Sequence, residues 1–397
     1  MKLVFVVPSF YDGRLSKKVK TGQAVIVGEL CRNFSSKMDV LVTGYPVHGE
    51  NLGYANLIST RTVAMIRWIR TSDLRDMVSV WRKSGKKYGI NIGLKDGIKI
   101  IFYKALGRKF VSDARREDWD VVAMHDFGQG NMEVLKKCME NNLKCVVTLH
   151  MYVGKKTTLE GKMYLDRAER EGYLLEETDV PITVVSSGLK RRILEDYRNV
   201  SPDRITVIPN GTSLEQINEA VDERMRFLCI GTISARKNQI QLISSLKYLP
   251  EDIQSKVKIL FIGEDSMDGL LQKTIVEKGY EDMAEYIGAV EHEKLRFFYK
   301  SAFAVISTSL NEAFGLTFIE GFMHGLPAVF FDDIDSANEL YDQNAVELIQ
   351  GKRDQDIAEA IIRTVNGHWN RLLIRKHGMK FDIKRIAKEY EKIYEKL

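Results

Sequence analysis

The chain has 397 residues, of which 44% are hydrophobic and 28% are charged, with a formal net charge of +5. This length is enough for two globular domains, and the composition excludes a disordered or fibrous protein. The four cysteines show no Cys-x-x-Cys pairing and no histidine partners at metal-ligand spacing, so we expect buried, reduced thiols and a cytoplasmic location.

The first predicted element is a buried strand at residues 3–7, an apolar run that Pro8 ends and that is too short for a signal-peptide core or a membrane span. Further apolar runs alternate with helical patterns, which is typical of parallel sheets. The predicted strands are residues 40–43, 121–124, 146–149, 182–185, 205–208, 227–230, 259–262, 304–307 and 328–331.

Residues 61–116 carry fifteen basic residues against four acidic ones, interleaved with apolar side chains such as Ile66, Trp68 and Trp81. This mixture suits an anionic membrane surface or a lipid-pyrophosphate acceptor. A solvated basic face is the plainer alternative. No nucleic-acid-binding motif accompanies the charge, so we expect no nucleic-acid partner.

Two histidines, His125 and His150, each close an apolar strand of the first half. The carboxyl ends of parallel strands are where ligands bind in open α/β sheets, although a lone histidine is more often structural. The Asn-Gly turn at residues 210–211 ends this series of strands, and residues 226–231 begin another. We therefore place a domain boundary between residues 208 and 209.

Arg236 and Lys237 follow the glycine that ends the strand at residues 227–230, where the next helix is predicted to begin. Cations at a helix N-terminus oppose the helix dipole. Their presence indicates that they face a shared anion, with a solvated pair as the alternative.

The segment 308–327 places Glu312 and Glu320 eight positions apart around the glycine turn at Gly315. A helix that begins near Gly315 points its first amides at the end of the preceding strand, which suits a phosphate. Glu320, about one turn further, suits a ribose diol, and Glu312 is left for the other end of the ligand, such as a sugar.

This segment resembles the Glu-x7-Glu signature of retaining glycosyltransferases of family 4, in which Phe-Gly-Leu follows the first glutamate and Gly-x-Pro closes the helix. The resemblance implies an α/β protein of GT-B architecture, with two Rossmann-like domains whose parallel sheets face across a cleft. It implies an acceptor-binding domain at residues 1–208, a donor-binding domain at residues 209–379, and a helix at residues 380–397 that crosses back to the first domain.

The resemblance also implies a function. The protein would move a sugar from a nucleoside diphosphate sugar, with a UDP-sugar favoured, to an acceptor hydroxyl with retention at the anomeric carbon. The acceptor would be a sugar, a glycolipid or a lipid pyrophosphate in bacterial polysaccharide, glycolipid or glycoprotein synthesis. Location would be cytoplasmic, with peripheral contact to the inner face of the membrane.

The predicted catalytic residues are Glu312, His125, Lys237 and Arg236. By the resemblance, the two cations would stabilise the leaving diphosphate, Glu312 would orient the sugar, and His125 would contact it from the other domain. Lys237 matches the family lysine. The family arginine commonly lies at the position where this chain has Thr232, so Arg236 would replace it only because it lies nearby in the sequence.

The predicted donor-binding residues share strand-end or helix-start positions, and Glu320 among them would bind the ribose. Gly22 stands where the family usually has two adjacent glycines, so this match is partial. The full set is Glu320, Phe314, Gly315, Leu316, Thr317, Gly288, Val290, Ser309 and Gly22.

We expect no metal or other cofactor, because Arg236, Lys237 and the helix at Gly315 would supply the positive potential. The acidic residues 332, 333 and 335 are interpreted as a polar loop. Two alternatives to a transferase stay open. One is a GT-B-fold sugar-nucleotide epimerase, and the other is a non-catalytic, transferase-like subunit that stabilises a partner.

Overall fold

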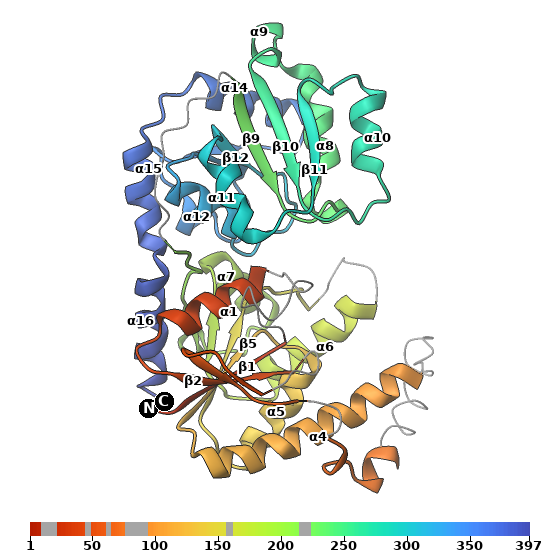
Figure 1. Cartoon of the computed structure of the whole chain (residues 1–397), viewed down its shortest axis with the longest axis vertical. Helices are drawn as coiled ribbons and strands as arrows, with labels where there is room; N and C mark the ends of the chain where they lie inside the picture. The colour runs from red at the N-terminus through yellow and green to blue at the C-terminus, as the bar shows by residue number, and fades with distance from the viewer. Residues whose placement is uncertain (9–21, 44–48, 61–64, 76–93, 156–161, 214–223) are drawn as a thin grey trace. The chain divides into compact units, whose positions relative to one another are not determined.

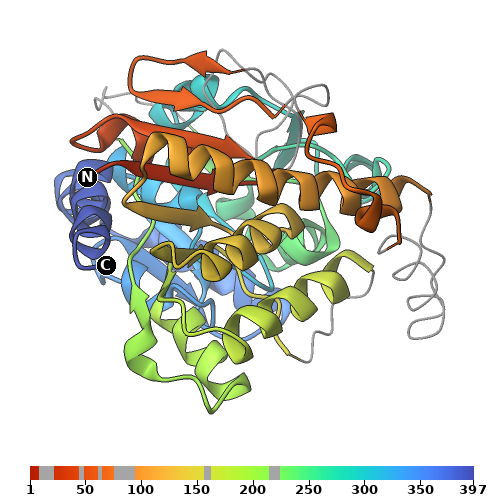
Figure 2. The ribbon, with the colours of Figure 1, turned by 90° about the horizontal axis from the view of Figure 1, so that it is seen from below.

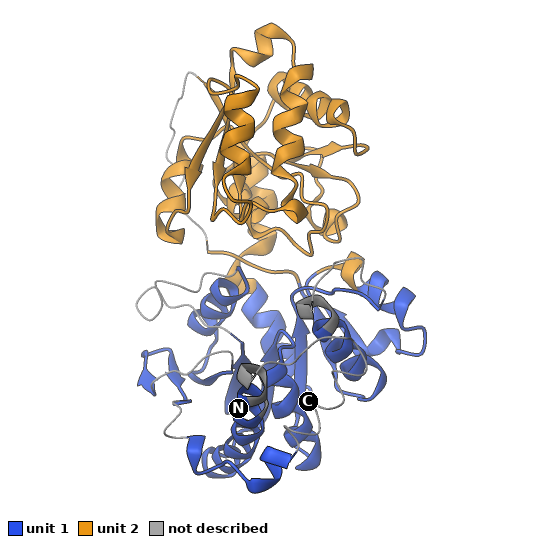
Figure 3. Cartoon of the chain, turned by 90° about the vertical axis from the view of Figure 1, so that its right-hand side faces the viewer, with its two compact units in different colours: residues 1–185, 190–208, 386–397 blue, residues 186–189, 209–385 orange. Residues whose placement is uncertain are grey.

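The computed structural model describes residues 1–8, 22–43, 49–60, 65–75, 94–155, 162–213 and 224–397. The chain forms two compact units (Figure 3), one of residues 1–185, 190–208 and 386–397 and the other of residues 186–189 and 209–385. The chain thus changes unit between residues 208 and 209, the position of the predicted boundary. Residues 186–189 and 380–385, expected in the first domain, group with the second unit.

The first unit is built on a sheet with the strand order β3-β4-β2-β1-β5-β6-β7-β8 (Figure 1). Every neighbouring pair is parallel except β3 and β4. The central strands are buried along their whole length, which explains their continuous apolar runs. The strands are β1 (Leu3–Val7), β2 (Met38–Val42), β3 (Glu50–Asn51), β4 (Ala55–Leu57), β5 (Val121–His125), β6 (Cys145–Leu149), β7 (Ile182–Val184) and β8 (Ile205–Val207).

Helices cover this sheet, and two of them, α4 and α5, pack side by side (Figure 2). The helices are α1 (Gly22–Asn33), α4 (Leu94–Glu117), α5 (Gln129–Glu140), α6 (Lys162–Glu176), α7 (Ser187–Asp196) and the C-terminal α16 (Ile383–Tyr394). The end of α16 belongs to the first unit, where Tyr394 stacks on Phe34 with ring centroids 6.0 Å apart. The helix expected at residues 380–397 is therefore present as Ile383–Tyr394.

The second unit contains a fully parallel sheet with the order β11-β10-β9-β12-β13-β14. Successive strands run outward from β9 to one side and then from β12 to the other. This is the Rossmann order, and its topological switch point lies between β9 and β12. The strands are β9 (Met225–Ile230), β10 (Val257–Ile262), β11 (Ala284–Gly288), β12 (Ala304–Ile306), β13 (Ala328–Phe331) and β14 (Val346–Ile349).

The helices of the second unit follow most of its strands. They are α8 (Gln239–Ser245), α9 (Glu251–Gln254), α10 (Leu270–Glu277), α11 (His292–Lys300), α12 (Leu316–Met323), α13 (Ala337–Leu340), α14 (Asp354–Asn366) and α15 (Arg371–Gly378). Of these, α12 packs against α15 and against β12. Burial of its apolar residues, such as Phe318 and Phe322, fixes the helix that begins at the predicted glycine turn.

Each predicted strand is present, with ends shifted by no more than two residues. The short strands β3 and β4 and the edge strand β14 were not predicted, since their sequences lack a long apolar run. Arg236 and Lys237 lie in a 3-10 turn, Ala235–Lys237, and not in the first turn of an α-helix. The left-handed backbone of Asn238, with φ of +57°, separates this turn from α8.

Within the described ranges, no helix is both long enough and apolar enough to cross a membrane. The four cysteines are free thiols in the core, as their spacing predicts. Burial raises the pKa of Cys229 to about 12 and that of Cys31 well above its ordinary value, so these thiols stay protonated.

Candidate active site

The loops that follow β9 and β12 meet at the switch point of the second sheet. Backbone groups join them, since the Leu310 N–H donates to the carbonyl of Arg236 at 2.9 Å. The Arg236 Nη1 in turn donates to the Asn311 carbonyl at 2.7 Å, and the Thr308 hydroxyl donates to the Asn238 carbonyl at 3.0 Å. The two predicted groups of charged residues are thereby held next to each other.

Lys237 and Glu312 form an ion pair across these loops. Their side chains are 18% and 16% exposed, so solvent reaches both partners. The Lys237 ammonium is the predicted ligand of a diphosphate, and in this structure it pairs with Glu312. An incoming anion would therefore compete with the carboxylate for the same cation.

Gly315 caps the N-terminus of α12 in the left-handed region, with φ of +83° and ψ of 72°. A Cβ at this position would collide with the Phe318 ring, so both the backbone angle and the space require glycine. Leu316 and Thr317 form the first turn of α12, where helix amides have no intrahelical acceptor. This geometry places potential anion donors directly after the Glu312 loop.

Phe314 and Ser309 support the loop from inside. Phe314 is 2% exposed and packs its ring against Phe381 with centroids 5.8 Å apart. Its carbonyl accepts a hydrogen bond from the Ser336 hydroxyl at 2.7 Å. Ser309 is also 2% exposed and donates to the Asn311 carbonyl at 3.1 Å. Because both side chains are buried, they stabilise the conformation of the turn.

Glu320 lies on α12, and both of its oxygens are engaged. The Tyr299 hydroxyl donates to Oε2 at 2.6 Å, and His292 Nε2 lies 3.0 Å from Oε1. Burial, followed by the Glu320 charge, raises the pKa of Tyr299 well above its ordinary value, so the phenol stays a donor. The carboxylate therefore has a fixed orientation.

Sequence reasoning missed Tyr299 and His292. A signal was available, because His292, Leu295 and Tyr299 recur at the spacing of one face of a helix. This spacing does not by itself connect the helix face to Glu320. Only the packing of α11 beside α12 brings the two polar groups together.

The strand β11 ends at Gly288, whose φ is +86° and around which an added Cβ would meet nothing within 4 Å. Val290 follows two residues later and is half-buried. The Tyr286 hydroxyl donates to the Gly263 carbonyl at 3.0 Å, which links the ends of β10 and β11. The role of Gly288 and Val290 in donor binding stays a prediction.

Residues 186–189 are attached to the second unit by two backbone contacts. The Ser187 N–H donates to Glu339 Oε1 at 2.7 Å, and the Gly188 N–H donates to the Asp335 carbonyl at 3.0 Å. A Cβ on Gly188 would collide with that carbonyl, so glycine is required. Glu339 thus binds protein backbone, which explains why this segment leaves the first unit.

The acidic residues after β13 form a turn, as expected. Lys352 donates to Asp333 Oδ1 at 2.5 Å, and the Asp335 N–H donates to the Glu312 carbonyl at 3.2 Å. Among the described residues, no three His, Cys, Asp or Glu side chains are grouped to hold a metal ion. The expectation of a metal-free reaction stays a prediction.

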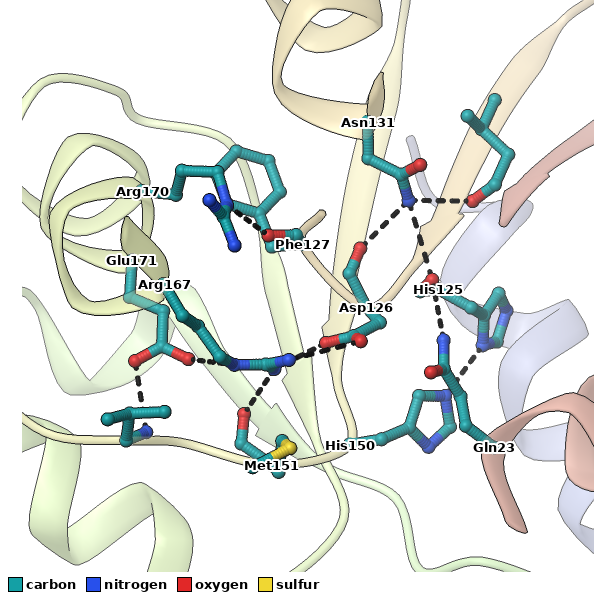
Figure 4. Close-up of polar contacts among 12 residues, drawn as sticks. Gln23, His125, Asp126, Phe127, Asn131, His150, Met151, Arg167, Arg170 and Glu171 are labelled. Carbon is teal, nitrogen blue, oxygen red and sulfur yellow. Dashed lines mark hydrogen bonds and ion pairs between the residues drawn. The ribbon is translucent and has the colours of Figure 1, made fainter. Parts of the chain in front are cut away.

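In the first unit, His125 ends β5 with 0% exposure (Figure 4). Its Nδ1 lies 3.1 Å from His150 Nε2, and its Nε2 lies 3.4 Å from the Tyr394 hydroxyl. Burial, and then His150, lower the pKa of His125 well below its ordinary value. His125 is thus a neutral, enclosed imidazole, and direct contact with a sugar stays a prediction. His150 is the half-buried partner.

A buried ionic network lies next to this pair (Figure 4). Arg167 on α6 pairs with Asp126 and with Glu171, and also donates to the Met151 carbonyl at 3.0 Å. Glu171 is 0% exposed and accepts the Val153 N–H at 3.0 Å. The network therefore ties together the chain segments that follow β5 and β6, and sequence reasoning gave no hint of it.

Gly22 is the exposed first residue of α1, and residues 9–21 before it lie outside the described part. The adjacent Gln23 donates from Nε2 to the His125 carbonyl at 3.0 Å (Figure 4). The structure thus gathers Arg236, Lys237 and Glu312 with the start of α12 in the second unit. Gly22 and His125 belong to the first unit.

Two parallel α/β units, one with Rossmann strand order and charged loops at its switch point, define a GT-B-type protein. The structure matches that of the lipopolysaccharide outer core galactosyltransferase WaaB over 100% of both chains, with a TM-score of 0.70 and 16% identity. It also matches Anabaena HepE in complex with UDP over 100% of both chains, with a TM-score of 0.68 and 14% identity.

Two family models match the sequence, and together they span residues 90–378. Residues 212–378 match glycosyl transferases group 1, and residues 90–216 match glycosyltransferase family 4. The chain belongs to glycosyltransferase family 4, which confirms the resemblance seen at residues 308–327. The GT-B fold expected from that resemblance is likewise confirmed.

The matches to curated relatives cover only part of each protein. The alpha-monoglucosyldiacylglycerol synthase of Streptococcus pneumoniae is 26% identical over 205 residues, which is 47% of this chain and 46% of the synthase. The chain spans 42% to 46% of the length of this and three other curated relatives.

Proposed function

We propose that this protein transfers a sugar from a nucleoside diphosphate sugar to an acceptor hydroxyl, with retention at the anomeric carbon. The observation that carries the proposal is the Lys237–Glu312 ion pair, set at the switch point directly before the N-terminus of α12. A partly exposed cation, helix amides and a second carboxylate further along the helix are the groups that a diphosphate, its ribose and its sugar require.

In the proposed mechanism, the diphosphate displaces Glu312 from the Lys237 ammonium. The acceptor hydroxyl gives its proton to the leaving diphosphate while its oxygen bonds to the anomeric carbon and the bond from that carbon to the diphosphate breaks. The electron pair of the broken bond stays on the leaving phosphate oxygen, where Lys237, Arg236 and the α12 amides stabilise the negative charge. Glu312, once released, would orient the sugar hydroxyls.

Glu320 would bind the ribose hydroxyls in this proposal. Its orientation is already fixed by the Tyr299 hydroxyl and by His292. A preorganised acceptor needs little rearrangement when the diol arrives, and that favours binding of the donor. The role assigned to Glu320 is therefore affinity for the nucleotide, with little effect on the chemical step.

We favour a UDP-sugar donor because HepE, a structural neighbour, binds UDP. We also propose a glycolipid or lipid-pyrophosphate acceptor. The name of the synthase from Streptococcus pneumoniae indicates a lipid product, and the basic residues between 61 and 116 suit an anionic partner. A cytoplasmic location at the inner membrane face, in bacterial glycan synthesis, is part of the proposal and agrees with four free, buried cysteines.

The test is a calorimetric screen of UDP, GDP, ADP and their sugars against wild type and Glu320→Ala, with and without a chelator. We expect one nucleotide to bind equally well in both conditions and Glu320→Ala to weaken it by roughly tenfold to a hundredfold. The exposed Glu277→Ala on α10 is the matched control and should bind like wild type.

The proposal fails if no nucleotide binds, which would favour a non-catalytic subunit. Turnover of the donor into an epimer in the absence of any acceptor would instead favour the epimerase. Loss of binding on chelation would overturn the metal-free part of the proposal.

A further inference from the structure

A surface pocket of about 660 Å³ lies in the first unit, between α4, the end of α5 and the turn at residues 65–75. Five of its lining residues are cationic and only Glu140 is acidic. The cations are Arg70, Arg108, Arg115, Arg116 and Lys137. The pocket draws on residues other than those of the candidate active site, all of which lie in other elements.

Buried contacts fix the walls of this pocket. Arg108 pairs with Asp73, which is 1% exposed, and donates from Nε to the Trp68 carbonyl at 2.8 Å. Burial alone would raise the pKa of Asp73, but hydrogen bonds from Arg108 and the Arg70 N–H bring it below its ordinary value. The turn that carries Trp68 is therefore held against α4 in one position.

The positive charge of the pocket is only partly neutralised within the described residues. Arg108 pairs with Asp73, Arg116 with its neighbours Asp113 and Glu117, and Lys137 with Glu140.

Arg70 and Arg115 have no carboxylate partner in the described part of the chain. The Arg115 Nη2 reaches only the Asn141 Oδ1, at 3.3 Å. Two exposed guanidinium groups thus line one pocket and are available to a phosphate, whose oxygens match the donor geometry of arginine.

The turn also exposes apolar side chains beside the cations. Ile66, Ile69 and Leu74 are 59%, 42% and 49% exposed. Exposed aliphatic residues next to arginines match the interface of an anionic bilayer, where the cations meet headgroups and the aliphatic chains meet the acyl boundary. A free phosphate would explain the cations but not this apolar rim.

We propose that this pocket binds the phosphate of an anionic phospholipid headgroup, with Arg70 and Arg115 as donors. Ile66 and Ile69 then rest at the acyl boundary. The inference deepens the proposed lipid acceptor, since it names the part of the chain that meets the lipid surface. Lipid binding needs no sugar donor, so this proposal and the transferase proposal fail in separate experiments.

The test measures co-sedimentation of the full chain with vesicles of phosphatidylcholine, with and without phosphatidylglycerol. We expect binding only to the anionic vesicles, weakened by salt. Arg70→Glu with Arg115→Glu should weaken it by at least about tenfold. Arg191→Glu with Arg198→Glu, exposed on and after α7, changes the charge equally and should bind like wild type.

Equal binding to both vesicles, or equal loss in the Arg191 and Arg198 control, would overturn the proposal. Calorimetric binding of inorganic phosphate to the pocket without vesicle binding would overturn the lipid assignment.

Discussion

The two units place different chemistry at the same topological position. In the second unit, the loops beside the switch point carry Lys237 and Glu312, which are partly exposed and paired with each other. In the first unit, β5 at the corresponding place ends in His125, which is fully enclosed by aromatic and imidazole rings. One sheet edge keeps a partly exposed ion pair, whereas the other satisfies its polar groups internally.

The charged groups of the two edges differ in the same way. Asp126, Arg167 and Glu171 of the first unit hold the backbone of two loops, and a ligand could not replace these contacts without leaving buried charges unpaired. An ionic cluster at a strand end is therefore not by itself a binding site. Exposure to solvent separates the two cases.

The largest expected effect comes from Lys237→Ala. Without the ammonium, the leaving diphosphate loses its principal cation, and we expect kcat for sugar transfer to fall by roughly 100-fold to 1,000-fold with a smaller change in the donor KM. Steady-state transfer from a radiolabelled donor measures both constants. Lys273→Ala, on the surface of α10, removes the same charge and should have no effect. An unchanged kcat in Lys237→Ala would mean that the exposed ion pair of the second unit takes no part in sugar transfer.

Arg167→Met tests the other half of the comparison. Removing the guanidinium leaves Asp126 and Glu171 as buried carboxylates without their partner, so we expect the free energy of unfolding to fall by about 3 kcal/mol. Urea denaturation followed by circular dichroism measures this loss. Arg170→Met, which removes one hydrogen bond to the Phe127 carbonyl, should cost less.

Nucleotide binding supplies the second readout for Arg167→Met. The folded variant should bind the nucleotide with the affinity of wild type, because the predicted donor groups other than Gly22 lie in the second unit. A large loss of affinity without a loss of stability would mean that the first unit's network also belongs to the ligand site.

Tyr299→Phe should have a moderate effect on nucleotide binding. The variant keeps the packing but removes the hydroxyl that orients Glu320, so we expect Kd to rise about threefold to tenfold with little change in kcat. Calorimetry on the purified variant gives the Kd. Tyr248→Phe, which is exposed in the same unit, is the control. A change in kcat alone would place Tyr299 in the chemical step instead.

A further effect concerns the pH dependence of stability. Burial lowers the pKa of His324 to about 4, against an ordinary value of 6.5. Between these values the unfolded chain binds more protons than the native one, so stability falls as the pH falls from about 6.5 to about 4.

We expect His324→Gln to reduce this pH dependence by about 1–2 kcal/mol, measured as the free energy of unfolding at pH 7 and pH 4.5. The exposed His368→Gln should leave it unchanged. Equal pH dependence in wild type and His324→Gln would mean that the buried ring is not the titrating group.

The sequence by itself determined the parallel architecture, the boundary near residue 208 and the glycine turn before α12. Continuous apolar runs specify buried parallel strands, and Gly315 has a backbone angle and a crowded position that other residues would not tolerate. The pattern at residues 308–327 was also enough to indicate the family, because the two glutamates and the glycine turn lie within one short segment of the chain.

Only the tertiary structure decided which polar groups meet. Tyr299 and Glu320 are 21 residues apart, and Lys237 and Glu312 are 75 apart, so neither contact leaves a local pattern. The structure also enclosed His125, because Phe5 and Tyr394 reach it from the two ends of the chain. Burial depends on packing between distant segments, and that packing separates a partly exposed charge from an enclosed one.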